Sequence, residues 1–245
     1  MGLLDIFSAE ARKQKAFDKM RAKLVSKNMQ HDDRMWVIQQ LGEMDTDDAT
    51  RALFRRWDMV SDKKREDITE KEYLADVLAA KGSALLPFLQ EHNDHSINIT
   101  WPIQVLRRVV DAEAVVAELV RVLNAETSRA ASFRPEKKLR VIELLADFPT
   151  DARVTPAVLP CLSDFDADVR FEAAHLLGRV GTEEARAGLV GQVCSAEEDS
   201  GRVRKALLQA IYDRGFEVVD RKDEIAPHLG DDWRIGPKGT LIIAD

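Results

Sequence analysis

The sequence is poor in cysteine and aromatic residues and has no long apolar run. Its two cysteines, Cys161 and Cys194, lie in apolar stretches, which is typical of buried thiols rather than of a disulfide. No run of 18 apolar residues occurs, so no segment is expected to cross a bilayer. The start, Met1–Phe7, is acidic and too short for a signal peptide. We therefore expect a cytoplasmic protein with no integral membrane association.

Sequence patterns typical of catalysis and metal binding are also missing. There is no Gly-rich phosphate loop, Ser/His/Asp arrangement or reactive Cys-His pair. The run Asp164–Asp168 begins like a calcium loop, but Val169 replaces its glycine and His175 its glutamate, so a helix cap is the better interpretation. Residues 91–95 cluster possible ligands without a second, distant ligand pair. The sequence thus predicts no enzyme, no metal and no cofactor.

The charge balance points away from nucleic acid. The formal net charge of -7 is opposite to what a protein needs to neutralise phosphates. Residues 1–30 are an exception, with seven Lys and Arg against three Asp and Glu, whereas residues 143–245 have twelve against twenty. This asymmetry would orient a partner or a second copy, although solvated helix faces produce similar imbalances. With 45% hydrophobic and 32% charged residues, the composition is typical of a soluble helical protein.

What the sequence does contain is an internal repeat. Asp168-Val169-Arg170 is followed by small and apolar residues at helical spacing, and Val203-Arg204 restarts the same frame 34 residues after Val169-Arg170. Weaker copies share a leucine or isoleucine before a turn, at Leu41, Leu78, Leu106, Leu145, Leu177 and Ile211. A period of this length with helix-turn-helix units predicts an α-solenoid, whose units bury their apolar faces by stacking on neighbours.

Each unit is predicted to hold two helices, the second starting behind a capping residue such as Thr46, Asp111 or Thr182. Two long polar loops are expected between units, at residues 60–69 and 124–136. Residues 9–26 predict an amphipathic helix whose apolar stripe comprises Ala16, Phe17, Met20 and Leu24. At the other end, residues 233–235 and 240–243 read as two strands around a four-residue turn.

The residues Asp168, Arg170, Ala173, Leu177 and Gly178, supported by Val203-Arg204, resemble a HEAT repeat of the short type common in bacterial proteins. This resemblance implies an all-α, right-handed α-solenoid of about six HEAT-like helix pairs over residues 31–230. Residues 1–30 would then form an N-terminal capping helix, and residues 231–245 a short C-terminal β-hairpin or tail. In this family the arginine at that position bonds acidic groups of adjacent repeats, so the resemblance gives a structural role to Arg34, Arg170 and Arg204.

The leading functional hypothesis is a non-enzymatic scaffold or adaptor that binds another protein on a concave face lined by the second helices. Candidate binding residues, chosen because they fall between the apolar positions, are Arg51, Arg55, Glu118, Arg121 and Arg186. An ordinary solvated face would show the same pattern.

Three alternatives remain open, namely a bilin lyase or chaperone, a DNA glycosylase or nucleic-acid binder, and peripheral membrane contact, whereas a hydroxylase is not favoured. Similar HEAT-like proteins act as bilin lyases or chaperones. Others are DNA glycosylases, for which only the stretch Arg55–Asp58 is suggestive. Iron-dependent HEAT-repeat hydroxylases use paired His-Glu dipeptides, and the chain has none. Residues 1–26 also permit peripheral contact with a membrane surface.

Overall fold

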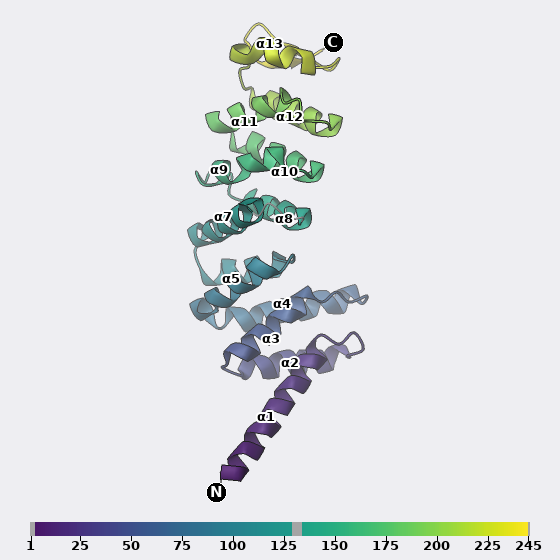
Figure 1. Ribbon diagram of the computed structural model, residues 1–245, viewed down its shortest axis with the longest axis vertical. Helices are drawn as coiled ribbons and strands as arrows, with labels where there is room; N and C mark the ends of the chain where they lie inside the picture. The colour runs from purple at the N-terminus through teal and green to yellow at the C-terminus, as the bar shows by residue number, and fades with distance from the viewer. Residues whose placement is uncertain (1–2, 129–133, 245) are drawn as a thin grey trace. The chain divides into compact units, whose positions relative to one another are not determined.

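The computed structural model describes residues 3–128 and 134–244, which form an all-α solenoid of helix pairs with a small β-hairpin near the C-terminus (Figure 1). These residues fall into two compact units, Met1–Val115 and Val116–Asp245. The sequence predicted one repeat segment, 31–230, between two short ends. The boundary between the observed units falls inside a helix, α7 (Ala112–Ser128).

The first unit consists of helices arranged as consecutive pairs. Its elements before α7 are α1 (Leu3–Leu24), α2 (His31–Glu43), α3 (Asp47–Asp58), α4 (Lys64–Ala79), η1 (Gly82–Leu85), α5 (Leu86–His95) and α6 (Thr100–Val109). The first helices of successive pairs, α2, α4 and α6, pack directly on one another. Their repeat leucines, Leu41, Leu78 and Leu106, are all buried, so stacking of neighbouring units makes this core.

The second unit repeats this plan. After the remainder of α7, it comprises α8 (Pro135–Leu145), α9 (Val154–Val158), η2 (Leu159–Ser163), α10 (Ala167–Val180), α11 (Glu183–Val193), α12 (Gly201–Arg214), η3 (Val219–Arg221), α13 (Lys222–Ile225), η4 (Ala226–His228), β1 (Trp233–Ile235) and β2 (Leu241–Ile243). The first helices α8, α10 and α12 stack, and their repeat residues Leu145, Leu177 and Ile211 are buried.

A glycine directly after the repeat leucine lets two of the stacked helices approach closely. A Cβ added at Gly178 on α10 would lie 2.8 Å from the Cβ of Ala210 on α12. At the matching position of α2, a Cβ on Gly42 would lie 2.4 Å from Val77 on α4. The repeat position of Gly178 therefore serves helix packing, since a larger side chain there would push the next first helix away.

The C-terminal hairpin follows the sequence prediction closely. Strands β1 and β2 are antiparallel, with Trp233 opposite Ile243 and Ile235 opposite Leu241. Trp233 is buried and its ring lies 5.0 Å from that of Tyr212 on α12. The hairpin thus packs on the last long helix of its own unit, which supplies the support that an isolated hairpin lacks.

The predicted caps are present, and helices α4 and α7 extend into the two segments predicted as long loops. The side chains of Thr46, Asp111 and Thr182 accept hydrogen bonds from the amides of Ala49, Ala114 and Ala185. Asp166, in the suspected calcium run, caps α10 by accepting bonds from the amides of Asp168 and Val169.

The polar loops were overestimated because charged residues in them are buried in ion pairs. Helix α4 already starts at Lys64, and α7 continues to Ser128; residues 129–133 of the second loop lie outside the described part of the chain. Buried Lys71 binds Asp67 at 2.8 Å, and buried Lys137 binds Glu126 at 2.9 Å. Such pairing makes burial of polar residues possible, and composition alone does not reveal it. Among the described residues, no helix is both long and apolar enough to span a membrane.

Candidate functional site

Helix α3 presents consecutive residues to different surroundings. At 100° per residue, neighbours along a helix point to different faces. Arg55 is exposed, whereas Arg56 and Trp57 are fully buried. The stretch that sequence analysis considered as a single feature is thus divided between an exposed surface and the core.

The exposed side of α3 forms a pocket with α5, which we call the α3–α5 pocket. Its volume is about 160 Å³, and its walls are formed by Arg51, Phe54, Arg55, Phe88, Glu91, His92 and His95. The Arg51 Nε atom donates to both oxygens of Glu91, at 3.0 and 3.2 Å, and its guanidinium lies 5.0 Å from the centre of the Phe88 ring. The Glu91 carboxylate raises the pKa of Arg51 above its ordinary value, mainly through this hydrogen bond.

The inner side of the pocket is aromatic. The ring of Phe54 lies 5.0 Å from that of Trp57 and 5.2 Å from that of His92. His92 Nε2 also lies 3.7 Å from a carboxylate oxygen of Asp58. Residues 91–95, expected in a polar joint, belong to α5 instead, and Asn93 is fully buried. The surroundings of His92 are aromatic, so this run fits packing better than metal binding.

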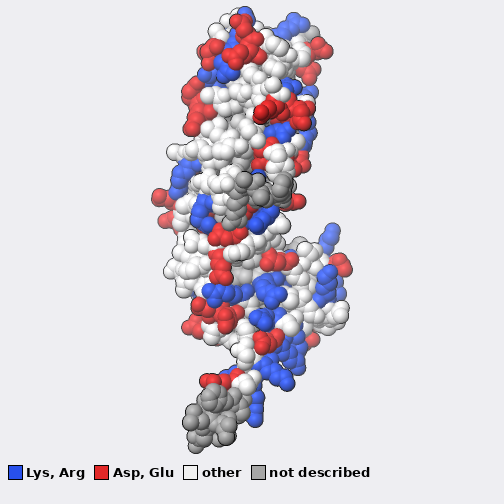
Figure 2. All heavy atoms as spheres, in the orientation of Figure 1, with Lys and Arg blue, Asp and Glu red and all other residues white. Residues whose placement is uncertain are grey.

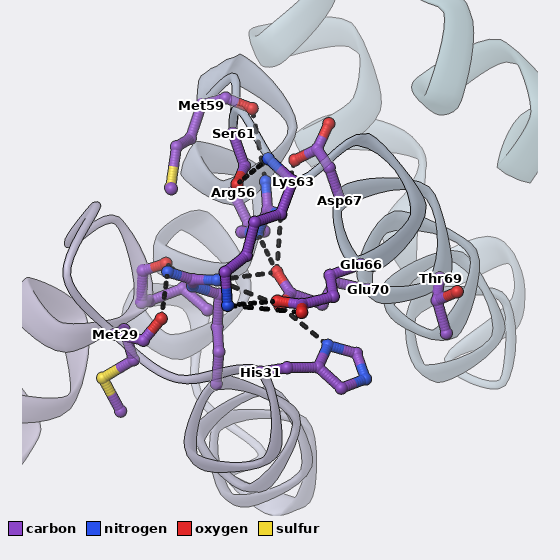
Figure 3. A network of polar contacts seen from close by, with 12 residues as sticks. Met29, His31, Arg56, Met59, Ser61, Lys63, Glu66, Asp67, Thr69 and Glu70 are labelled. Carbon is purple, nitrogen blue, oxygen red and sulfur yellow. Dashed lines mark hydrogen bonds and ion pairs between the residues drawn. The ribbon is translucent and has the colours of Figure 1, made fainter.

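Behind the pocket, α3 is tied to α4 by an ion-pair network centred on Glu70 (Figure 3). Buried Arg56 donates to a Glu70 oxygen through Nε at 2.9 Å and to Asp67 through Nη2 at 2.6 Å. Arg34 on α2 reaches both Glu70 oxygens at 3.0 Å and also donates to the carbonyl of Leu24, at the end of α1. One buried carboxylate thereby joins α2, α3 and α4.

The residues around Glu70 include a cluster that could hold a metal ion. His31, Glu66 and Glu70 offer ligand atoms within 4.8 Å of one another, and Figure 3 shows the His31 ring directed at Glu70. Both Glu70 oxygens, however, already accept bonds from arginine, and Lys63 binds Glu66 at 3.1 Å. A metal would have to displace or approach several cations, which argues against a metal site here.

The second unit places Arg170 in a similar network. Its guanidinium bonds both oxygens of buried Glu198 at 2.9 Å and one oxygen of Asp199 at 3.0 Å. Arg204, given the same role by the repeat resemblance, donates instead to the backbone carbonyl of Glu198. Asp168 is exposed and pairs with Arg202. Arg34, Asp168 and Arg170 thus bond residues of the next repeat or of the turn before it, whereas Arg204 bonds the turn before its own helix.

The predicted binding residues are divided between the two units. Arg51 and Arg55 share the α3–α5 pocket. Glu118, expected to be exposed, is buried and accepts two hydrogen bonds, of 2.8 and 2.9 Å, from Arg121 three residues later. Arg186 on α11 binds Glu183 at 2.7 Å, both oxygens of Asp220 at 3.0 Å and the carbonyl of Glu217 at 2.9 Å.

Arg186 therefore fastens α11 to the segment that follows α12. Hydrogen bonds to Glu183 and Asp220 raise its pKa, and the same contact lowers the pKa of Asp220. Sequence analysis missed Phe88, Arg56 and Glu70 as neighbours of the candidate residues. Phe88 carried a usable signal, since it lies in the second helix of the next unit. Arg56 and Glu70 carried no such sequence signal, because nothing in their spacing shows that their side chains form an ion pair.

Comparison with known proteins gives the following findings. A family described as HEAT repeats matches residues 127–212. No curated protein matches the chain. Among solved structures, human deoxyhypusine hydroxylase in complex with glycerol matches with 13% identity and a TM-score of 0.32, over 90% of this chain and 95% of the other.

The last comparison corrects one prediction. The sequence predicted that the chain is not an enzyme, and this is contradicted, since the matching structure is that of an enzyme. The prediction relied on missing local motifs. A TM-score of 0.32 transfers no activity or substrate to this chain.

Proposed function

Because residues 127–212 match HEAT repeats, we propose that the chain serves as a helical scaffold that binds another protein, and that the α3–α5 pocket receives an acidic residue of that partner. HEAT repeats support the general role, since stacked helix pairs present extended and rigid binding surfaces. The location and the chemistry of the contact come from the pocket itself.

The observation that carries this proposal is that the Arg55 side chain is exposed and has no bonding partner among the described residues. It is exposed, it lines the pocket, and it makes no hydrogen bond or ion pair with any other residue in the described ranges 3–128 and 134–244. The neighbouring Arg51 is already bound by Glu91. Arg55 thus has its donors available for a carboxylate, which guanidinium groups bind in a two-pronged geometry.

The size and lining of the pocket define what enters it. Ligand sites that enclose a whole drug-sized molecule have volumes of about 300–1,000 Å³. The α3–α5 pocket, at about 160 Å³, is smaller and suits one or two side chains of a partner. Phe54 and Phe88 add apolar walls, so the partner segment that fits best has an acidic residue next to an apolar one.

The pocket is held rigid before any partner arrives. On one side Arg56 fixes α3 to Glu70 and Asp67, and on the other Glu91 fixes α5 to Arg51. Asn98, just beyond α5, donates to the carbonyl of Trp57 at 2.9 Å. A site that needs no reordering loses less entropy on binding, which favours affinity. Glu118, Arg121 and Arg186 are proposed only as secondary contacts to the partner. All three are already engaged in intramolecular ion pairs.

The test is a charge reversal with a matched control. We would compare partner recovery from source-cell lysate on the full-length wild type, Arg55→Glu and Arg65→Glu by quantitative mass spectrometry. Arg65 is an exposed arginine on α4 of the same unit and does not line the pocket. We expect a stoichiometric partner on wild type and Arg65→Glu, and its loss by at least about tenfold on Arg55→Glu, because like charges then oppose each other.

A second arm identifies the contact on the partner. Replacing each acidic residue of the recovered protein by its amide should reveal one whose loss weakens binding to wild type but not to Arg55→Glu. Equal recovery on Arg55→Glu and wild type, or the absence of such a coupled acidic residue, would show that the pocket is not the binding site.

A further inference from the structure

Three aromatic side chains occupy the same repeat position on the first helices of the first unit. Trp36 on α2, Tyr73 on α4 and Trp101 on α6 each lie five residues before the repeat leucine of their helix. We call these three residues the aromatic ladder. In the second unit the same position is occupied by Arg140, Glu172 and Ala206.

The aromatic ladder faces away from the core. Five residues correspond to about 500°, or about 140° around the helix axis, so each ring is turned away from the buried leucine of its helix. Trp36 is 53% exposed, and Tyr73 and Trp101 are half-buried. Helix α4 packs on α2 on one side and on α6 on the other. The three rings therefore follow one another along the stack on the solvent side of the first helices.

The spacing of the rings follows from helix packing. Helices in contact lie about 8–10 Å apart, so successive rings of the ladder are separated by about that distance. A polyproline II helix has three residues per turn and rises about 3.1 Å per residue, so its side chains repeat on one edge about every 9 Å. An α-helix repeats about every 5.4 Å, and a β-strand repeats on one face about every 6.6 Å. Of these three conformations, polyproline II matches the ladder.

The ring edges carry hydrogen-bond donors with no acceptor among the described residues. The indole N–H groups of Trp36 and Trp101 and the hydroxyl of Tyr73 form no hydrogen bond within residues 3–128 and 134–244. A polyproline II helix has no internal hydrogen bonds, and its prolines have no N–H group, so it offers carbonyl acceptors. The donors of the ladder and the acceptors of such a peptide are complementary.

The end of the ladder at α2 is acidic. Asp32 and Asp33 lie four and three residues before Trp36, so they share its side of the helix. Both are exposed, and neither forms an ion pair with another described residue. Asp76, beside Tyr73, is already bound by Arg108 at 2.6 Å. The free carboxylates attract a basic residue.

We propose that the aromatic ladder binds a proline-rich segment of another protein in the polyproline II conformation. The segment lies along the stack, a proline at every third position packs on one ring, and a lysine or arginine meets Asp32 and Asp33. Because this conformation forms before binding, little entropy is lost. The ladder shares no residue with the α3–α5 pocket, so the proposal does not rest on the proposed function.

The charges favour this occupant over single-stranded nucleic acid. Bases also stack on aromatic side chains, but such sites combine the rings with a positively charged groove. On the face that Figure 2 draws, red and blue side chains lie interspersed over the helices that follow α1. At the α2 end of the ladder, Asp32 and Asp33 would repel phosphates.

The experiment measures peptide binding to the full chain by isothermal titration calorimetry. The probe is a synthetic peptide of two lysines followed by prolines at every third position, with alanines between them. We expect saturable binding to wild type, weakened about tenfold or more by Trp36→Ala and by Tyr73→Ala. Phe165→Ala, which removes an exposed aromatic residue of the second unit, is the matched control and should bind like wild type. Circular dichroism checks that each variant is folded.

A second peptide, with the same number of prolines at every fourth position, tests the spacing and should bind about fivefold more weakly or worse. Failure of wild type to bind the first peptide, equal binding of the two peptides, or unchanged binding by Trp36→Ala overturns the proposal.

The charge arm replaces Asp32 and Asp33 together by lysine. This double variant should bind the lysine-tagged peptide about fivefold more weakly or worse, and should prefer a peptide whose two lysines are replaced by glutamates. An unchanged preference overturns the placement of the basic residue. Oligothymidine is titrated in parallel, and its binding by wild type in place of the peptide, lost in Trp36→Ala, overturns the proposal by assigning the ladder to single-stranded nucleic acid.

Discussion

The two units place an arginine at the same repeat position and satisfy it in different ways. Arg34 of the first unit meets Glu70, which lies on the next first helix and is shared with Arg56. Arg170 of the second unit meets Glu198, which lies in the turn before the next first helix and also accepts from Gln192 and the Ser200 amide. In both units the buried carboxylate links successive repeats.

The difference shows what the repeat position fixes and what it leaves open. It fixes a buried cation at the start of a first helix. The anion comes from whichever neighbouring segment reaches it, α4 in one unit and a turn in the other. Glu70 has two arginines and is fully buried, whereas Glu198 has one arginine and two neutral donors. The two networks should therefore respond differently to the same kind of change.

The largest effect is expected from Glu70→Gln. This change keeps the shape of the side chain but leaves Arg34 buried without its anion and Arg56 with Asp67 alone, which should lower the free energy of unfolding by about 3–5 kcal/mol. Urea unfolding measures the loss, and hydrogen exchange should locate it in residues 31–79. Glu66→Gln is the control, since Glu66 is only half-buried and pairs with exposed Lys63. A loss below about 1 kcal/mol for Glu70→Gln would contradict our account of this network.

A smaller effect is expected from Arg170→Met in the second unit. Glu198 loses its charged partner but keeps the donors of Gln192 and Ser200, so the cost should be about 1.5–3 kcal/mol. The same two measurements apply, with protection lost around residues 167–214. Arg179→Met, an exposed arginine on the same helix, controls for removal of a charge. If Arg170→Met costs more than Glu70→Gln, the ranking of the two networks is wrong.

Gly178→Ala tests whether close helix contact, rather than charge, determines the spacing of α10 and α12. The new Cβ would meet Ala210 at 2.8 Å, and the resulting overpacking should cost about 1–3 kcal/mol, reduced by the roughly 1 kcal/mol that alanine gains in helix propensity. Thermal unfolding measures the net effect. Gly191→Ala on α11, where nothing lies within 4 Å of the added Cβ, should leave stability unchanged or raised. Equal effects at both sites would rule out the steric explanation.

The smallest effect concerns acid sensitivity. Burial alone would raise the pKa of Glu198, but hydrogen bonds from Arg170, Gln192 and the Ser200 amide lower it below its ordinary value. Its contribution to stability is thus present above the unfolded pKa of about 4.3 and is lost as the pH falls through the lower, folded value. Between about pH 5 and pH 3, unfolding free energies of Glu198→Gln should fall less steeply than those of wild type. Parallel curves would contradict this assignment.

Much of the fold could be predicted because helical periodicity and capping are local. The six repeat residues, the caps at Thr46, Asp111 and Thr182, and the hairpin at Trp233–Ile243 each depend on neighbours within a few positions. The loops at 60–69 and 124–136 were extended too far, because polar composition hides the buried pairing of Lys71 with Asp67 and Lys137 with Glu126.

The candidate site was predicted only in part for the same reason. Arg51 and Arg55 were chosen as exposed positions on a second helix, and they do line a pocket. Glu118 was chosen by the same rule but is buried and pairs with Arg121 on the same helix, which the spacing of apolar residues does not show. The prediction that the chain is not an enzyme was wrong because it treated missing local motifs as evidence of missing chemistry.

The sequence by itself determined that this protein is a helical repeat chain with a C-terminal hairpin, because apolar spacing, caps and turns act over a few residues. Only the tertiary structure decided which charges meet. Arg34 and Glu70 are 36 residues apart and Arg170 and Glu198 are 28 apart, and no local pattern connects either pair. The same applies to the availability of Arg55, which follows from the packing of α3 against α4 and α5. Because these ion pairs are buried, breaking one of them costs much free energy. The stacked helices are therefore held together by contacts that form only when the helices stack.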